Sequence, residues 1–154
     1  MRGKGLEARL VSSEDKAFRA LMKEFEGECT RRFGKGSGRM CLADSDAEII
    51  STCVILKNGQ GIACGLLQDM DGETAQVRCL YVKPEFRKLG LGTDVIQTLE
   101  LQGLWQGCMF IAMATSREMK ECFGLCKKLG FGKTAPWPGF SGDKSWTCLK
   151  KEID

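Results

Sequence analysis

The stretch Leu80-Tyr-Val-Lys-Pro-Glu-Phe-Arg-Lys-Leu-Gly-Leu-Gly92 indicates more about the fold than any other segment of this chain. Its apolar start favours a β-strand, and Pro84 ends that strand because proline cannot donate a ladder hydrogen bond. Gly90 and Gly92 allow the backbone to approach a ligand closely. Apolar residues then recur at helical spacing, at Val95, Ile96, Leu99 and Leu104.

The loop between this strand and this helix has the features of an anion site. Amide N–H groups at a helix N-terminus bind anions because they lack partners within the helix. Arg87, inside the loop, adds a forked cation that suits a phosphate group. The segment therefore predicts a strand, a loop and a helix that together hold a pyrophosphate.

The composition is that of a globular protein, and we expect a single domain over residues 1–154. Hydrophobic residues make up 43% and charged residues 28% of the chain, which is ordinary. A net charge of +3 with scattered lysines and arginines gives no support for nucleic-acid binding. We find no apolar run of membrane-spanning length and no apolar stretch after the basic first residues. We therefore expect no membrane segment, no signal peptide and a cytoplasmic location.

The chain has nine cysteines and no histidine. No Cys-x-x-Cys pair occurs, and the odd number without an export signal favours reduced thiols over a disulfide framework. Without histidine the commonest general base and the commonest metal ligand are missing, so we expect no metal. Five cysteines lie in apolar runs and are expected to be small buried hydrophobes: Cys53, Cys64, Cys79, Cys108 and Cys148.

The patterns along the chain predict alternating strands and helices. Strands are expected over residues 6–11, 49–56, 62–70, 74–82, 108–114 and 146–149. Three helices are expected. The first follows a cap at Ser13, the second follows the loop at residues 87–92 (the glycine loop), and the third runs from a cap at Ser116 to Leu129. Residues 27–46 are expected to be loop with at most a short helix, and Asn58-Gly59 to close a hairpin.

The order of these elements predicts a mixed sheet. A strand, helix, strand unit in the middle of the chain implies a parallel pair, while the hairpins before it are antiparallel. Two familiar phosphate motifs do not fit. The dinucleotide fingerprint lacks its third glycine after Gly92, and Gly132-Lys-Thr134 lacks the first glycine of a P-loop, since Lys127 stands there.

Four blocks, in order, resemble the GNAT superfamily of N-acetyltransferases. The first two are Gly61-Ile-Ala-Cys-Gly-Leu-Leu67 and the strand at residues 74–82; the third is Arg87-x-x-Gly-x-Gly92; the fourth is Cys122-Phe-Gly-Leu-Cys-Lys-Lys-Leu-Gly-Phe131. The resemblance implies an α/β fold. Its mixed, mostly antiparallel central sheet would have about six or seven strands and be flanked by about four helices.

The resemblance also implies a site for acetyl-CoA as acyl donor, without a metal. Backbone groups of Leu80, Tyr81 and Val82 would contact the pantetheine arm in the gap between two parallel strands. The pyrophosphate would be wrapped by the following loop, at Arg87, Lys88, Leu89, Gly90, Leu91, Gly92 and Thr93.

The catalytic groups of relatives are changed in this chain. Cys126 stands where many relatives carry a tyrosine that protonates the departing thiolate, and its other interpretation is core packing. Some relatives use a glutamate of the central strand as a base, and Gln76 occupies the nearest equivalent position in this chain. Glu28 and Glu26 are the acidic residues nearest to where relatives build acceptor sites, with Glu28 as a further candidate base.

Two further residues are candidates for binding the acceptor. Arg78 follows Gln76 on the same face of its strand, where it would bind a carboxylate or phosphate or, equally well, pair with a helix. Trp137, between two prolines, would wall the acceptor pocket or pack.

The sequence thus predicts an enzyme that moves an acetyl group from acetyl-CoA to an amine of a small molecule or peptide. Transfer would be by direct attack in a ternary complex, because no activated nucleophile is evident, although an acyl-enzyme on Cys126 stays open. The alternative is a catalytically weak or inactive acyl-CoA-binding module of the same fold. An exposed strand edge leaves a homodimer as one assembly that the chain could form.

Overall fold

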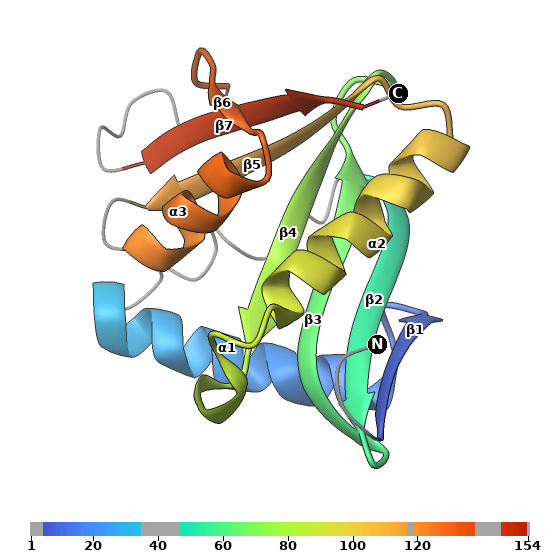
Figure 1. Ribbon diagram of the computed structural model, residues 1–154, viewed down its shortest axis with the longest axis vertical. Helices are drawn as coiled ribbons and strands as arrows, with labels where there is room; N and C mark the ends of the chain where they lie inside the picture. The colour runs from blue at the N-terminus through green and yellow to red at the C-terminus, as the bar shows by residue number, and fades with distance from the viewer. Residues whose placement is uncertain (1–4, 35–46, 117–118, 138–145, 154) are drawn as a thin grey trace.

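The computed structural model describes residues 5–34, 47–116, 119–137 and 146–153, and Figure 1 shows its elements. In chain order these are β1 (Leu6–Val11), α1 (Lys16–Phe33), β2 (Ile49–Lys57), β3 (Gln60–Asp69), β4 (Thr74–Val82), the 3₁₀ helix η2 (Pro84–Phe86), α2 (Leu91–Trp105), β5 (Phe110–Ser116), α3 (Lys120–Lys128), β6 (Gly132–Lys133) and β7 (Trp146–Glu152).

The strands form one mixed sheet in the order β1-β2-β3-β4-β5-β7-β6. All neighbouring pairs are antiparallel except β4 and β5, which are parallel. The predicted mixed, mostly antiparallel sheet of six or seven strands is confirmed. Within the described ranges the sheet carries three α-helices and one 3₁₀ helix, slightly fewer than the four helices expected.

The parallel strands β4 and β5 pair only near their starts. Their register joins Thr74 to Phe110 and ends at Gln76, opposite Ala112. Beyond Gln76 the two strands separate, as Figure 1 shows. In the same part of β4, the pairing with β3 is shifted, and Cys79 has a φ of 61°, which marks a bulge. The second half of β4 therefore borders a gap in the sheet.

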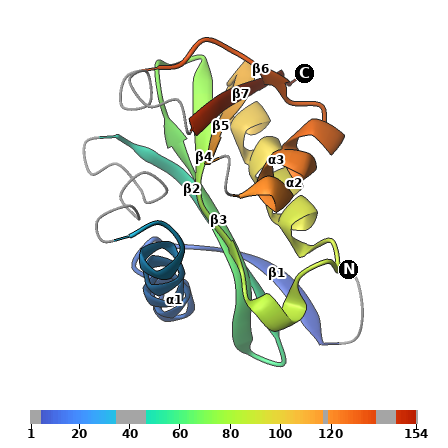
Figure 2. The ribbon, with the colours of Figure 1, turned by 90° about the vertical axis from the view of Figure 1, so that its left-hand side faces the viewer.

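Helices cover both faces of the sheet. Helix α1 packs on one face, through Phe18, Leu21 and Phe25, while α2 and α3 cover the other (Figure 2). Close packing of α2 depends on Gly65 of β3, where an added Cβ would lie 2.7 Å from Val95 Cγ1. Among the described helices, none has the length and apolar character needed to cross a membrane.

Both predicted helix caps are wrong. The cap of α1 is Asp15, not Ser13, and its carboxylate accepts a hydrogen bond from the Phe18 N–H at 3.1 Å. Helix α1 then continues to Phe33 through residues that were expected to be loop, because Cys29 is buried with the helix's apolar stripe. Ser116 is the last residue of β5, and α3 begins at Lys120 instead.

The strands agree more closely with the sequence. The predicted hairpin at Asn58-Gly59 is confirmed, with φ values of 49° and 84° that suit a tight two-residue turn. Cys108 is buried but lies before β5, which begins at Phe110. The two-residue strand β6 was not predicted, because so short a segment has no periodicity to detect.

In the described ranges, seven cysteines are buried free thiols and an eighth, Cys122, is a partly exposed one. None of these eight forms a disulfide, and the five that were predicted to be buried are each at most 6% exposed. Burial raises the pKa of Cys53 to about 11 and that of Cys64 well above its usual value. These thiols therefore stay protonated in the folded chain. Cys41 lies outside the described residues.

We expect the protein to lose stability as the pH rises above about 9. The folded pKa values of Cys53 and Cys64 lie above those of exposed thiols. The folded state then holds protons that the unfolded state releases. This stabilisation is complete below the unfolded pKa and falls by about 1.4 kcal/mol per pH unit for each such thiol within its window. Urea unfolding between pH 7.5 and 10.5 measures the slope. Cys64→Ala should make it shallower; a flat wild-type profile would contradict the expectation.

Candidate functional site

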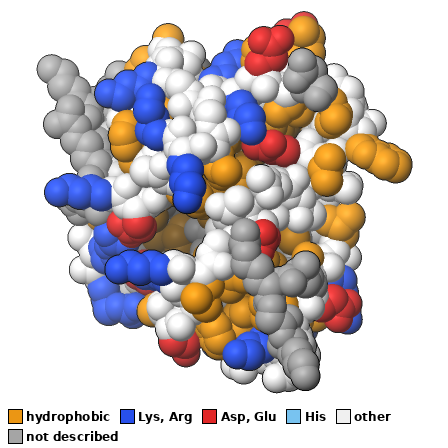
Figure 3. Space-filling view, in the orientation of Figure 1, with side chains coloured by type: hydrophobic (Ala, Val, Ile, Leu, Met, Phe, Trp, Pro, Cys, Tyr) orange, Lys and Arg blue, Asp and Glu red, His pale blue; other side chains and the backbone are white. Residues whose placement is uncertain are grey.

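A cavity of about 490 Å³ lies beside the gap in the sheet. Helices α1 and α3, the end of β4 and the start of α2 enclose it. Its lining is Phe25, Glu28, residues 80–82, residues 86–88, residues 90–93, Met119, Glu121, Cys122 and Leu125. Figure 3 shows a hollow on this face, with apolar side chains inside and charged ones beside it.

The loop that leads into α2 lines the cavity and ends at the N-terminus of that helix. Lys88 and Gly90 have left-handed φ values of 66° and 86°, which turn the chain sharply before the helix. The first hydrogen bond of α2 is donated by Asp94 to the Gly90 carbonyl at 3.1 Å. The N–H groups of residues 91–93 therefore belong to the first turn, where a helix provides no acceptor. Amides in this position of a helix are suited to an anion.

The residues predicted to bind the coenzyme lie together at this cavity. All of them line it except Leu89, whose side chain is 56% exposed. Gly92 also sets how closely the neighbouring helix packs, because an added Cβ would lie 3.1 Å from Leu125 Cδ2 of α3. Their roles toward a coenzyme stay predictions.

The side chain of Arg87 turns toward helix α1. Its Nε donates a hydrogen bond to the Val82 carbonyl at 2.8 Å, and its Nη2 donates one to Glu28 Oε1 at 2.6 Å. The guanidinium also lies 5.7 Å from the centre of the Tyr81 ring. Arg87 thus joins the glycine loop to α1, a contact that the sequence did not predict.

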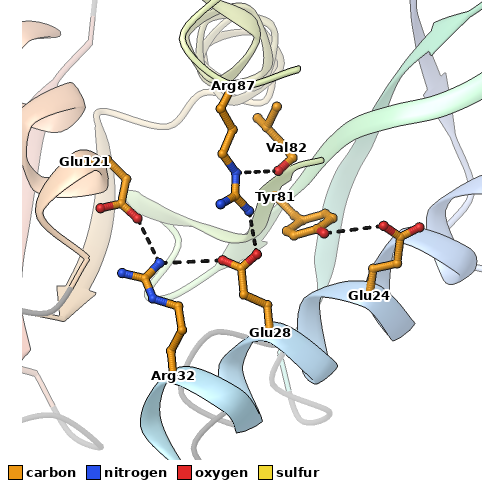
Figure 4. Close-up of polar contacts among 7 residues, drawn as sticks. All are labelled: Glu24, Glu28, Arg32, Tyr81, Val82, Arg87 and Glu121. Atoms are coloured by element: carbon orange, nitrogen blue, oxygen red, sulfur yellow. Dashed lines mark hydrogen bonds and ion pairs between the residues drawn. The ribbon is translucent and has the colours of Figure 1, made fainter. Parts of the chain in front are cut away.

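Glu28 is the centre of a charged cluster (Figure 4). Besides Arg87, its carboxylate faces Arg32 at 3.6 Å, and its side chain is only 13% exposed. Arg32 in turn pairs with Glu121 of α3 at 2.9 Å. The Arg32 guanidinium lowers the pKa of Glu121, against the opposite effect of burial. The cluster connects α1, the glycine loop and α3 around one side of the cavity.

Tyr81 is the only tyrosine of the chain. Its hydroxyl donates a hydrogen bond to Glu24 at 3.4 Å, and its ring packs 5.5 Å from that of Phe25. Burial, together with the charges of Glu24 and Glu28, raises the pKa of Tyr81 to about 12. The phenol therefore stays protonated and is directed toward α1.

A second, smaller cavity of about 30 Å³ adjoins the first. Gln76 and Arg78 both line it, as expected for residues on one face of β4. Gln76 is 5% exposed and stands where β4 and β5 part. The two cavities share four lining residues: Phe25, Leu80, Met119 and Cys122. The predicted base position and the predicted coenzyme site are therefore neighbours.

Cys126 lies behind the wall of the cavities. It is 0% exposed, and its thiol contacts Met113 Sδ at 3.5 Å. One turn earlier, Cys122 lines both cavities. A hydrogen bond from Cys122 lowers the pKa of Cys126, and burial opposes this shift. Sequence reasoning missed Cys122, although its spacing from Cys126 places the two thiols on one face of α3.

Two other candidates lie away from these cavities. Glu26 is exposed on α1, and Trp137 is half-buried after β6. Neither belongs to the described lining of the two cavities. Among the residues that the structure describes, we also find no group of three or more acidic, cysteine or histidine side chains that could hold a metal.

The seven-stranded mixed sheet with its helices matches the fold of acyl-CoA N-acyltransferases of the GNAT type. Residues 4–131 match the Acetyltransferase (GNAT) family, and the chain belongs to this family.

Individual relatives are distant. Over 73 residues the chain is 32% identical to an amino-acid acetyltransferase of Pseudomonas fluorescens, a match that covers 47% of this chain and 17% of that protein. A GNAT family acetyltransferase of Elizabethkingia anophelis with acetyl-CoA bound has a TM-score of 0.71 at 14% identity, covering 98% of this chain and 100% of the other. PaiA N-acetyltransferase of Thermoplasma acidophilum in complex with coenzyme A has a TM-score of 0.72 at 16% identity, covering 96% and 99%.

Proposed function

We propose that the chain transfers an acetyl group from acetyl-CoA to an amine by direct attack within a ternary complex. One observation carries the proposal: residues 91–93, in the first turn of α2, line a largely apolar cavity of about 490 Å³. The amides of a helix's first turn suit a pyrophosphate, and the apolar remainder of the cavity suits a pantetheine arm with its acyl group.

The donor would lie along the gap between β4 and β5. Its pyrophosphate would meet the amides of residues 88–93, and its pantetheine arm would run beside residues 80–82, where β4 has no partner in β5. The neighbours from Elizabethkingia anophelis and Thermoplasma acidophilum were solved with acetyl-CoA and coenzyme A bound, which supports the same ligand here.

The acceptor amine would enter where the two cavities meet. Gln76 can accept a hydrogen bond from the ammonium there but cannot take its proton, so the proton would leave to water. The neutral amine then attacks the acetyl carbonyl: a C–N bond forms, the C–S bond breaks, and the coenzyme leaves as a thiolate. The nitrogen loses its extra proton as it becomes an amide, and this proton passes, directly or by relay, to the departing thiolate. A thiol pKa of about 8.5 makes this a good leaving group, so no strong acid is needed.

The position of Cys126 favours direct transfer over an acyl-enzyme on that thiol. Cys126 is fully buried and separated from the cavity, so its sulfur is not presented to a thioester. Cys122 lines both cavities and would be the thiol that returns a proton to the leaving sulfur. The Tyr81 hydroxyl is turned toward Glu24 of α1 and would not take this role.

Amino acids are the first acceptors to test. Arg78 is a half-buried cation on the smaller cavity, where the carboxylate of an acceptor could pair with it. The relative from Pseudomonas fluorescens is an amino-acid acetyltransferase, although the match covers only 17% of it.

We expect the purified chain to release free thiol from acetyl-CoA only when a suitable amine is present. Acetyl-CoA would be incubated with amino acids, polyamines and short peptides with free N-termini, while a thiol-reactive dye follows the coenzyme. A rate at least about tenfold above hydrolysis, and within the usual range of about 1 to 1,000 per second at saturation, would support turnover. Mass spectrometry of the amine would show the added acetyl group.

Together with a binding measurement, the same experiment distinguishes the enzyme from the alternative, an acyl-CoA-binding module without turnover. That module would bind acetyl-CoA in a calorimetric titration yet release no thiol with any amine. A folded chain that binds no acetyl-CoA would contradict both functions.

A further inference from the structure

The carboxylate of Glu28 holds the glycine loop through Arg87. The Oε1 of Glu28 accepts the 2.6 Å hydrogen bond from Arg87, and its Oε2 faces Arg32 at 3.6 Å. Both oxygens are thus turned toward guanidinium groups (Figure 4). With the side chain 13% exposed, this is a charge-assisted contact that is mostly shielded from water.

Arg87 is held on three sides at the point where the loop begins. The Val82 carbonyl and Glu28 accept its hydrogen bonds, and the Tyr81 ring lies beneath the guanidinium. The next residue, Lys88, already has the left-handed φ of 66° that starts the turn toward α2. The conformation of the amide-bearing loop therefore depends on an arginine whose charged partner belongs to α1.

We propose that Glu28 is a positioning residue for the coenzyme: by fixing Arg87, it keeps the amides of residues 88–93 in the arrangement that receives a pyrophosphate. This inference rests on the proposed function, because it takes the ligand to be acetyl-CoA. Without Glu28, the Arg87 guanidinium loses its shortest contact, and the loop must be ordered when the ligand binds. Affinity then falls by the free energy of that ordering.

Two other roles for Glu28 lead to different outcomes. A general base would leave acetyl-CoA affinity unchanged and lower kcat, but both of its oxygens already face cations. A counter-ion that competes with the pyrophosphate for Arg87 would weaken binding, so removing it would tighten binding. Of the three roles, only the positioning role predicts that the loss of Glu28 weakens the binding of the pyrophosphate group.

The test compares two ligands on the full chain. Acetyl-CoA carries the pyrophosphate, and S-acetylpantetheine lacks it. We expect Glu28→Gln to raise the Kd of acetyl-CoA about tenfold or more, in line with the loss of one hydrogen bond to a charged group. The Kd of S-acetylpantetheine should change less than about twofold. Calorimetry would measure the first Kd, and ligand-observed NMR the weaker second one.

A double-mutant cycle shows whether Glu28 acts through Arg87. The variant E28Q/R87M should bind acetyl-CoA no more weakly than R87M alone. Once Arg87 is replaced, Glu28 has no guanidinium to fix at the start of the loop, so its loss has no further effect on binding. Glu14→Gln is the matched control. It also removes the carboxylate of a Glu–Arg pair, the one that Glu14 forms with Arg19 at 2.8 Å, but this pair is exposed and lies near the start of α1. It should leave both Kd values unchanged.

Each remaining outcome overturns the inference. Unchanged or tighter acetyl-CoA binding by E28Q excludes the positioning role, as does an equal loss of both ligands. Amide hydrogen exchange provides a second readout without ligand: the loop at residues 88–93 should exchange faster in E28Q, or in R87M if E28Q does not fold. Equal exchange in wild type and variant contradicts the role. A wild type that binds no acetyl-CoA overturns the proposed function instead.

Discussion

Replacing Gly90 by glutamate is expected to weaken acetyl-CoA binding by at least about a hundredfold. Gly90 has a φ of 86°, and a side chain there costs on the order of 1–2 kcal/mol. The new carboxylate would also stand beside the amides that are to receive a pyrophosphate, and like charges at such a site repel. Calorimetric titration of the wild type and G90E with acetyl-CoA measures the effect.

Gly107 provides the control for backbone strain. Its φ is 85°, it is exposed after α2, and an added Cβ would have no atom within 4 Å. G107E therefore carries the same unfavourable φ and the same new charge away from the cavity. It should lower stability as G90E does and bind acetyl-CoA like the wild type. If both variants lose binding equally, or if G90E stays within about tenfold of the wild type, the loop is not the coenzyme site.

The parts of the fold that the sequence predicts well are those set by neighbouring residues. Alternation and short apolar runs identify the strands, and Asn58-Gly59 identifies its hairpin because both residues accept a positive φ. The glycine loop was predicted for the same reason: Gly90 and the proline before it act on their own segment of backbone. Such signals need no knowledge of the partner elements.

The boundaries of the helices depend on which of several possible capping residues is used and on tertiary packing, and the sequence does not decide either. Ser13 and Asp15 both have a side chain that can cap α1, and the structure uses Asp15. The stretch that starts at Gly27 was predicted to be loop, yet α1 continues through it to Phe33, and Cys29 is buried with the helix. Tertiary packing outweighs local propensity at this end of the helix.

The contacts that shape the site join residues far apart in the chain. Arg87 and Glu28 are 59 residues apart, and no local pattern relates them. The prediction of Arg87 as a phosphate ligand followed from its loop alone. Likewise, Cys126 was singled out by its place in a family motif, while Cys122, one turn earlier on the same face of α3, lines the cavity and Cys126 contacts Met113. The depth of each turn of α3 is set by packing against β5, which a linear pattern does not show.

Packing also controls the site through Gly65, and Gly65→Val is expected to lower the free energy of unfolding by about 3 kcal/mol. An added Cβ would lie 2.7 Å from Val95 Cγ1 and 3.3 Å from Leu99 Cδ1, so α2 would have to move away from the sheet. The N-terminus of α2 carries the amides at the cavity. We therefore expect the folded fraction of the variant to bind acetyl-CoA more weakly as well. Urea unfolding and titration at low temperature measure the two effects.

Gly132→Val separates this packing effect from the general effect of a larger side chain. Gly132 is also a strand residue, in β6, but an added Cβ there would meet nothing within 4 Å. A β-branched residue in an open strand position is favourable or neutral. The stability of G132V should stay within about 0.5 kcal/mol of the wild type. If G65V were equally stable, α2 would not depend on Gly65 for its close approach to the sheet. The same contact would then not explain how the amides of α2 are placed beside the gap between β4 and β5.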